Sequence, residues 1–141
     1  MGLRRKGRVI AFQALYCWDV SHPATSELVR FQWLDEPEDT EHEQAHLFAR
    51  LMVAGTIENI ETVDQAIRRR LQHWDFSRLS WVDRAILRVG VYELLFHREV
   101  PPSVSIDEAI GIAKEFGADD SFRFINGVLD AVRREGEKDT G

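Results

Sequence analysis

The 141-residue chain has the length of one globular domain, carries a formal net charge of −6, and is 44% hydrophobic and 30% charged. These fractions exclude a wholly disordered chain. No apolar run approaches the roughly 18 residues needed to cross a bilayer, and Gln13 and Asp19 interrupt the apolar stretch after the basic start. Because Cys17 is the single cysteine, an intrachain disulfide is impossible. We therefore expect one cytoplasmic domain, residues 1–141, without a signal peptide or membrane segment.

The first feature along the chain is a basic segment. Four of the 18 basic residues lie within the first eight positions, where no acidic residue occurs. A local cluster of like charge indicates a partner better than the net charge does, so RNA or DNA binding is one interpretation. A solvated, fraying terminus is the other. The four cations are Arg4, Arg5, Lys6 and Arg8.

Apolar residues at helical spacing predict helices in the first half of the chain. A first helix through Val9 and Tyr16 ends at residues 21–23, and a short second helix covers 25–34. The acidic residues that follow, with Pro37, predict a linker.

Thr40 and Glu43 form a capping box that opens a long helix. Gly55 predicts a break or kink in it, followed by a further helix over 60–71.

The second half has clearer helix boundaries. Ser80 with Asp83 caps a helix over 82–96, whose apolar residues surround most of its circumference and predict a central position. Pro101 and Pro102 stop this helix. Ser105 with Glu108 then predicts the start of a helix that ends at Gly117, and Asp119 or Asp120 caps a final helix followed by a loose tail from Gly136. The pattern predicts an all-α protein of about seven helices.

One motif suggests an enzyme. His42-Glu43-Gln44-Ala45-His46 matches H-E-x-x-H, in which two imidazoles one helical turn apart bind zinc and the glutamate acts as a general base. Zinc hydrolysis needs a third ligand and an enclosed site, whereas this motif lies in the first turn of a helix beside an acidic run. A solvated helix start is therefore the favoured interpretation.

The start of the last predicted helix can serve a partner as well as the fold. One acidic residue suffices as a cap, so the second acid of Asp119-Asp120-Ser121 can face a partner. Phe122 and Phe124 point to different sides of the helix, so at least one is expected near the surface, where an aromatic ring can stack on an unpaired base.

Three blocks of sequence carry a resemblance that spans the chain. The first is Arg4-Arg5-Lys6-Gly7-Arg8 followed by Ala11-Phe12-Gln13-Ala14-Leu15-Tyr16. The second is Val82-Asp83-Arg84-Ala85-Ile86-Leu87-Arg88 running into Tyr92-Glu93-Leu94-Leu95, and the third joins residues 100–117 to Phe124-Ile125-Asn126-Gly127-Val128-Leu129-Asp130. In this order the blocks resemble the NusB family of bacterial transcription antitermination factors.

The resemblance implies a non-enzymatic protein with no cofactor and a NusB-like fold of two small packed helical subdomains, residues 1–74 and 75–135, followed by a loose tail at 136–141. It also implies pairing with the ribosomal protein NusE, binding of single-stranded boxA RNA in ribosomal RNA leaders, and assembly with other Nus factors on RNA polymerase. By motif position, the implied RNA contacts are Arg4, Arg5, Lys6, Arg8, Gln13, Lys114, Phe116, Ser121, Phe124 and Asn126. The implied contacts with the partner protein are Tyr16, Asp83, Arg84 and Asp120. Gly7 departs from the family pattern and predicts an arm that orders only on RNA.

The charge distribution indicates that RNA binding needs a second, basic protein. If all four N-terminal cations neutralised phosphates, the single-strand salt slope would be about −3, which supports only weak and poorly specific binding. A protein of net charge −6 repels RNA elsewhere. We therefore expect a basic partner, docked on acids such as Asp83 and Asp120, to complete an RNA clamp. A zinc hydrolase, a helical adaptor without RNA affinity, and a homodimer that masks the RNA surface are the alternatives.

Overall fold

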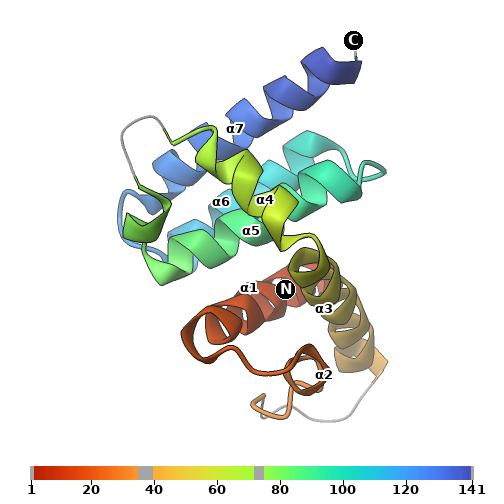
Figure 1. Ribbon diagram of the computed structural model, residues 1–141. Helices are drawn as coiled ribbons and strands as arrows, with labels where there is room; N and C mark the ends of the chain where they lie inside the picture. The colour runs from red at the N-terminus through yellow and green to blue at the C-terminus, as the bar shows by residue number, and fades with distance from the viewer. Residues whose placement is uncertain (1, 35–39, 72–74, 141) are drawn as a thin grey trace.

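The described part of the chain is helical apart from its turns (Figure 1). The computed structural model describes residues 2–34, 40–71 and 75–140, so the predicted linker at 35–39 lies outside the described residues. Seven α-helices occur within these ranges, which confirms the predicted all-α class. They are α1 (Leu3–Ser21), α2 (Thr25–Leu28), α3 (Thr40–Glu58), α4 (Ile60–Arg68), α5 (Trp81–Phe96), α6 (Pro102–Phe116) and α7 (Ser121–Thr140), with a 3₁₀ turn at Phe76–Arg78. Within the described ranges, no helix combines the length and the apolar character that a membrane span requires.

Helix α5 lies at the centre, as its apolar circumference predicts. It packs against α1, α3, α4, α6 and α7, and Figure 1 shows α1 and α3 below it and α7 above it. Leu15 of α1, Met52 of α3, Leu87 of α5 and Leu129 of α7 are fully buried in one continuous core. The division into subdomains at residues 74 and 75 stays a prediction.

The predicted cap of α5 is confirmed. The Ser80 hydroxyl oxygen accepts a hydrogen bond from the Asp83 backbone N–H at 3.0 Å. The predicted start of α6 at Ser105 is wrong, because the helix begins at Pro102 and Ser105 is buried inside it. A proline suits the first helical position, since its fixed φ is helical and its missing N–H has no partner there.

Two glycines allow helices to approach one another and do not break them. A Cβ at Gly55 would lie 2.8 Å from Cε1 of Tyr92, so glycine lets α3 pass close to α5. The predicted break at Gly55 is wrong: α3 continues to Glu58, and the junction with α4 falls at Asn59, whose side-chain amide donates to the Gly55 carbonyl at 2.8 Å. At Gly7, a Cβ would lie 2.6 Å from Cδ1 of Phe48.

The helix termini differ from the sequence predictions at three further places, the first being the end of α4 at Arg68 and not at residue 71. The second helix ends at Leu28, because Phe31 adopts φ 54° and the turn buries its side chain in the core. At the other end of the chain, α7 passes through Gly136 to Thr140, where the sequence predicts a loose tail. An ion pair one helical turn apart, Arg133 Nε to Glu137 Oε1 at 3.1 Å, supports this extension.

Candidate nucleic-acid interface

The basic segment is part of a regular helix. Helix α1 begins at Leu3, so the predicted arm that orders only on RNA is wrong. The helix is continuous through Gly7, which is buried against Phe48 of α3 and so holds the first turns of α1 in place. Because each residue turns about 100° around a helix, the four cations point in different directions and have different surroundings.

Arg8 points into the protein. Its side chain is buried, and its Nε donates to Oε2 of the equally buried Glu93 at 2.9 Å, while Nη2 donates to the other carboxylate oxygen. The pair joins α1 to α5 across 85 residues of sequence. The prediction that Arg8 contacts RNA is corrected for this reason: its charge is already paired with a carboxylate inside the fold.

Arg4 and Arg5 lie at the surface. Arg4 is exposed, with its guanidinium carbon 5.9 Å from the centre of the Phe48 ring. Arg5 reaches α6, where its Nε forms an ion pair with Oε2 of Glu108. Lys6, between Arg5 and Gly7, is half-buried. The exposed positive charge therefore begins at the first turn of α1 and continues towards α6.

Among the remaining predicted RNA residues of α1 and α6, Phe116 lies on the seam between these helices and Lys114 contacts α7. Phe12 and Phe116 pack with their ring centres 5.1 Å apart, and Phe116 remains 38% exposed. On the same helix, Lys114 is exposed, with Nζ 4.9 Å from the centre of the Phe122 ring of α7. Gln13, next to Phe12, is half-buried. Exposed cations and aromatic rings thus occur together here, as binding of unpaired bases requires.

The predicted RNA residues at the start of α7 differ in how far they are exposed to solvent. Asn126 is exposed and Phe124 is half-buried, so both have accessible surface. Ser121 is buried, and its hydroxyl oxygen accepts a hydrogen bond from the Ala118 N–H at 3.1 Å. The Ser121 side chain thus closes the turn that leads into α7 while lining the groove there, and its RNA contact stays a prediction.

The predicted partner-binding residues lie around the first turn of α5. Tyr16 is 40% exposed, with its ring centre 6.1 Å from that of Trp81. Asp83 and Asp120 line an open groove of about 710 Å³ between this turn and the start of α7. Arg84 is buried against Asp19, its Nε 2.6 Å from Oδ2, so its predicted contact with a partner is corrected.

Sequence reasoning missed two contributors to these surfaces. Trp81 is 43% exposed beside Tyr16, although it is not among the predicted site residues. The sequence predicts that Glu108 belongs to a capping pattern with Ser105, whereas its carboxylate forms an ion pair with Arg5. No local pattern could have identified the second, since its partner lies 103 residues away.

The H-E-x-x-H match lies in the first two turns of α3. His42 and His46 are half-buried, and the His46 ring packs edge-on against Phe31 with centres 5.3 Å apart. Among the described residues, no three His, Cys, Asp or Glu side chains come together as a group that could hold a metal ion.

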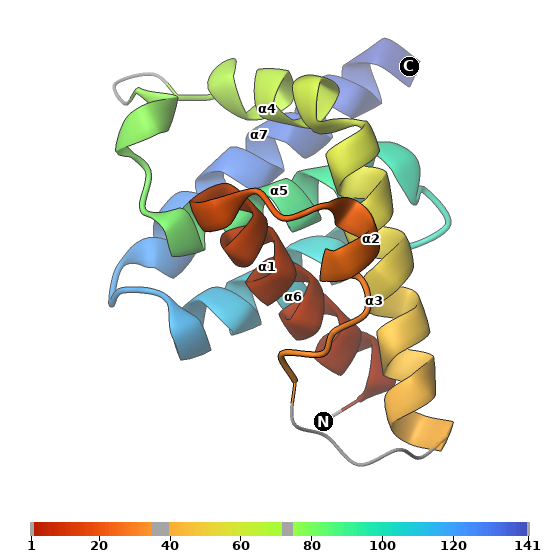
Figure 2. The same cartoon turned by 60° about the horizontal axis from the view of Figure 1, so that its bottom comes forward.

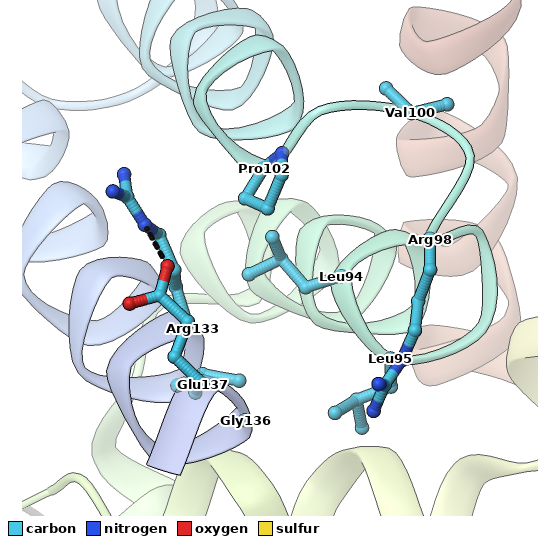
Figure 3. Close-up of a pocket in the computed structure, with 9 residues that line it drawn as sticks. Leu94, Leu95, Arg98, Val100, Pro102, Arg133, Gly136 and Glu137 are labelled. Carbon is cyan, nitrogen blue, oxygen red and sulfur yellow. Dashed lines mark hydrogen bonds and ion pairs between the residues drawn. The ribbon is translucent and has the colours of Figure 1, made fainter. Parts of the chain in front are cut away.

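A second groove lies where α5 and α7 end, lined by residues such as Leu94, Arg98 and Pro102 (Figure 3). The ion pair of Arg133 and Glu137 borders it. None of the predicted site residues lines this groove.

The fold and these surfaces define a small all-helical binding protein with a basic, partly aromatic seam and an acidic groove. Comparison with known proteins identifies the family, because residues 5–134 match the NusB family. The transcription antitermination protein NusB of Treponema denticola is 46% identical over 132 residues, covering 94% of this chain and 96% of the relative. The NusB protein of Treponema pallidum (strain Nichols) is 47% identical over 133 residues, covering 93% and 92%.

Solved structures agree with this assignment. The structure of T. maritima NusB is 40% identical, covers 94% of this chain and 91% of that chain, and has a TM-score of 0.81. A crystal structure of the antitermination factors NusB and NusE in complex with dsRNA is 28% identical, covers 94% and 97%, and has a TM-score of 0.78. The chain belongs to the NusB family of non-enzymatic transcription antitermination proteins.

Proposed function

We propose that this chain binds single-stranded boxA RNA of ribosomal RNA leaders together with the ribosomal protein NusE, and that the pair joins other Nus factors on RNA polymerase in the cytoplasm to promote processive transcription. The single observation that carries the proposal is the likeness, over 94% of this chain, to a NusB chain crystallised with NusE and RNA. The zinc hydrolase is set aside, because the family is not enzymatic.

The RNA side of the proposal rests on the seam of α1 and α6. Because Arg8 is paired inside the fold, Arg4, Arg5 and Lys6 remain as the N-terminal cations that can reach phosphates. Three phosphate contacts correspond to a single-strand salt slope of about −2, which is smaller than the sequence suggests. Phe116 adds surface for base stacking on this seam, worth roughly 1–3 kcal/mol per base with little sequence preference. Phe124 lines the groove at the start of α7, and its RNA contact stays a prediction.

The partner side rests on the groove at the start of α5. Asp83, Asp119 and Asp120 give this groove acidic walls, with Tyr16 and Trp81 exposed nearby. Oδ1 of Asp83 is buried without a hydrogen-bond partner among the described residues, and such an acceptor favours a donor supplied by a partner. A basic ribosomal protein fits this surface and offsets the net charge of −6 that repels RNA.

A gel-shift titration with a boxA-like RNA, with and without NusE and over a salt series, tests the proposal. We expect weak, salt-dependent binding by the chain alone and much tighter binding with NusE. Charge reversal of the groove by Asp120→Lys should remove the gain from NusE while leaving binding by the chain alone unchanged or slightly tighter.

Three outcomes would contradict the proposal. An RNA affinity that NusE leaves unchanged overturns the clamp. An absence of salt-dependent RNA binding in both arms favours a protein-binding adaptor. A homodimer that dissociates as RNA binds, measured by analytical ultracentrifugation, would instead place the RNA surface in a dimer interface.

A further inference from the structure

We propose that Glu108 is a positioning residue for RNA binding: together with Gly111 it holds the Arg5 guanidinium on α6, with the terminal nitrogens directed at an RNA phosphate. This inference rests on the proposed RNA-binding function. It assigns a role in RNA binding to the Glu108 carboxylate, whose negative charge by itself would repel RNA.

The contact joins the beginning of α1 to α6. Nε of Arg5 and Oε2 of Glu108 form an ion pair between residues 103 positions apart, and the two side chains are 29% and 26% exposed. Both are therefore largely covered, although each remains in reach of solvent.

Gly111 provides the second contact of the Arg5 guanidinium with α6, and we call Glu108 and Gly111 together the Arg5 seat. It follows Glu108 by three residues on the same face of α6. A Cβ at Gly111 would lie 2.7 Å from Nη1 and 2.9 Å from Cζ of Arg5, so the guanidinium rests directly on the helix backbone. Any larger residue at this position would push the guanidinium away.

The seat leaves donors available. Arg5 uses Nε for Glu108, and among the described residues its two terminal nitrogens donate no hydrogen bond. An arginine has five N–H donors in a fixed fork, so four remain on nitrogens whose direction is set by the carboxylate and the glycine. A planar fork held at one edge suits bidentate recognition of a phosphate at another.

Glu108 has two opposing effects on RNA affinity: its charge repels the phosphate, and its contact with Arg5 orders the guanidinium. At a separation of roughly 7 Å in water, the repulsion between Glu108 and a phosphate weakens binding by a factor of about 1.5 to 3, depending on salt. Immobilising a long side chain on binding weakens affinity by a factor of about 2 to 13. Since the seat orders Arg5 before RNA arrives, this ordering opposes the repulsion, and the sign of the net effect of Glu108 on RNA affinity is the quantity that the test measures.

The test measures the dissociation constant and salt slope of the full chain with a boxA-like RNA. Glu108→Ala should weaken binding about three- to tenfold and reduce the salt slope towards that of Arg5→Ala, because Arg5 no longer meets a phosphate in a fixed geometry. Glu108→Gln keeps an acceptor oxygen and should stay within about twofold of the unmodified chain. In the Arg5→Ala background, Glu108→Ala should have no weakening effect.

Gly111→Ala is a second, independent variant. It displaces the guanidinium while Glu108 is intact, and should weaken binding as Glu108→Ala does. Asp107→Ala is the matched control, since Asp107 is an exposed acid on the same helix without an ion pair among the described residues. This control should leave affinity unchanged or slightly tighter.

A carboxylate that merely competes with RNA predicts the opposite sign. If Glu108→Ala tightens binding as much as Asp107→Ala or more, the positioning role is overturned while the RNA-binding function stands. If the unmodified chain shows no salt-dependent RNA binding, with or without NusE, the proposed function fails and this inference fails with it.

Discussion

Two groups of arginines in this protein look alike in sequence and have opposite surroundings. Arg8, Arg84 and Arg88 are buried on α1 and α5, and each faces a carboxylate from another helix. Arg4 and Arg5 lie four and three positions before Arg8 and remain in reach of solvent. Because Arg5 also pairs with a carboxylate from another helix, the comparison teaches that burial of the guanidinium, and not the presence of a carboxylate partner, separates the arginines of the fold from those available to a ligand.

The buried group forms connections between helices. Arg88 binds Asp64 of α4 through two hydrogen bonds, Nε to Oδ1 at 2.9 Å and Nη2 to Oδ2 at 3.0 Å. Asp19 of α1 receives Arg84 and lies 3.4 Å from Arg88, so one carboxylate connects two turns of α5 to α1. Such pairs contribute modestly as a whole, but removing one partner leaves an uncompensated buried charge.

The largest expected effect comes from breaking the most buried pair. Glu93→Ala leaves Arg8 charged inside the fold and should lower the free energy of unfolding by about 3–5 kcal/mol, measured by urea denaturation followed by circular dichroism. The double variant Arg8→Met with Glu93→Leu removes both charges and should recover most of this loss. A loss below about 1 kcal/mol for the single variant would show that the pair is not buried in solution.

A smaller loss of stability is expected at the more accessible end of α5. Arg84→Ala removes the charged hydrogen bond to Asp19 and should lower the free energy of unfolding by about 1.5–3 kcal/mol in the same experiment. Arg98→Ala, an exposed arginine beyond the end of α5, is the matched control and should change stability by less than about 0.5 kcal/mol. Equal effects of the two variants would remove the distinction between the groups.

The exposed group should behave in the opposite way. Arg4→Ala is expected to change the free energy of unfolding by less than about 0.5 kcal/mol, since the side chain is exposed. Its effect should appear in RNA binding as a loss of about 0.7 in the salt slope. Arg98→Ala again serves as the control and should bind RNA normally. A stability loss with unchanged RNA affinity would assign Arg4 to the fold.

The smallest effect concerns an ion pair between the turn that follows α4 and helix α7. The hydrogen bond and charge of Arg70 hold the pKa of Glu135 below its usual value of 4.5, and Arg69 Nη1 lies 3.5 Å from the same carboxylate. A pKa lowered by folding adds stability above the unfolded-state pKa, and this contribution is lost as the pH falls through the folded-state pKa.

Glu135→Gln should therefore lower Tm slightly at pH 7, less than the variants at Glu93 and Arg84 do, because the pair is only partly buried and water screens it. The difference in Tm between the variant and the unmodified chain should shrink as the pH falls through the folded-state pKa of Glu135 and disappear below it. A difference that persists at low pH would mean that Glu135 stabilises α7 through packing and not through charge.

Much of the local structure could be predicted from the sequence, because helix signals act over a few residues. The cap at Ser80 and the central position of α5 follow from neighbouring side chains and from apolar periodicity. The start of α6 was misplaced because Ser105 carries a capping pattern, although Pro102 already provides a compatible first position. The family, too, could be identified from three blocks of sequence.

What the sequence determined by itself was the helical class and most helix boundaries, which depend on spacings of three or four residues, and the family, which three blocks of sequence identify. Only the tertiary structure decided which cations face solvent: Arg8 meets Glu93 across 85 residues, and Arg5 meets Glu108 across 103. It also decided the structural role of Gly7, Gly55 and Gly111, because at each of them a side chain from another helix approaches the backbone closely. The physical reason is the same in each case, because periodicity sets the face on which a side chain lies, whereas packing sets the group that it meets.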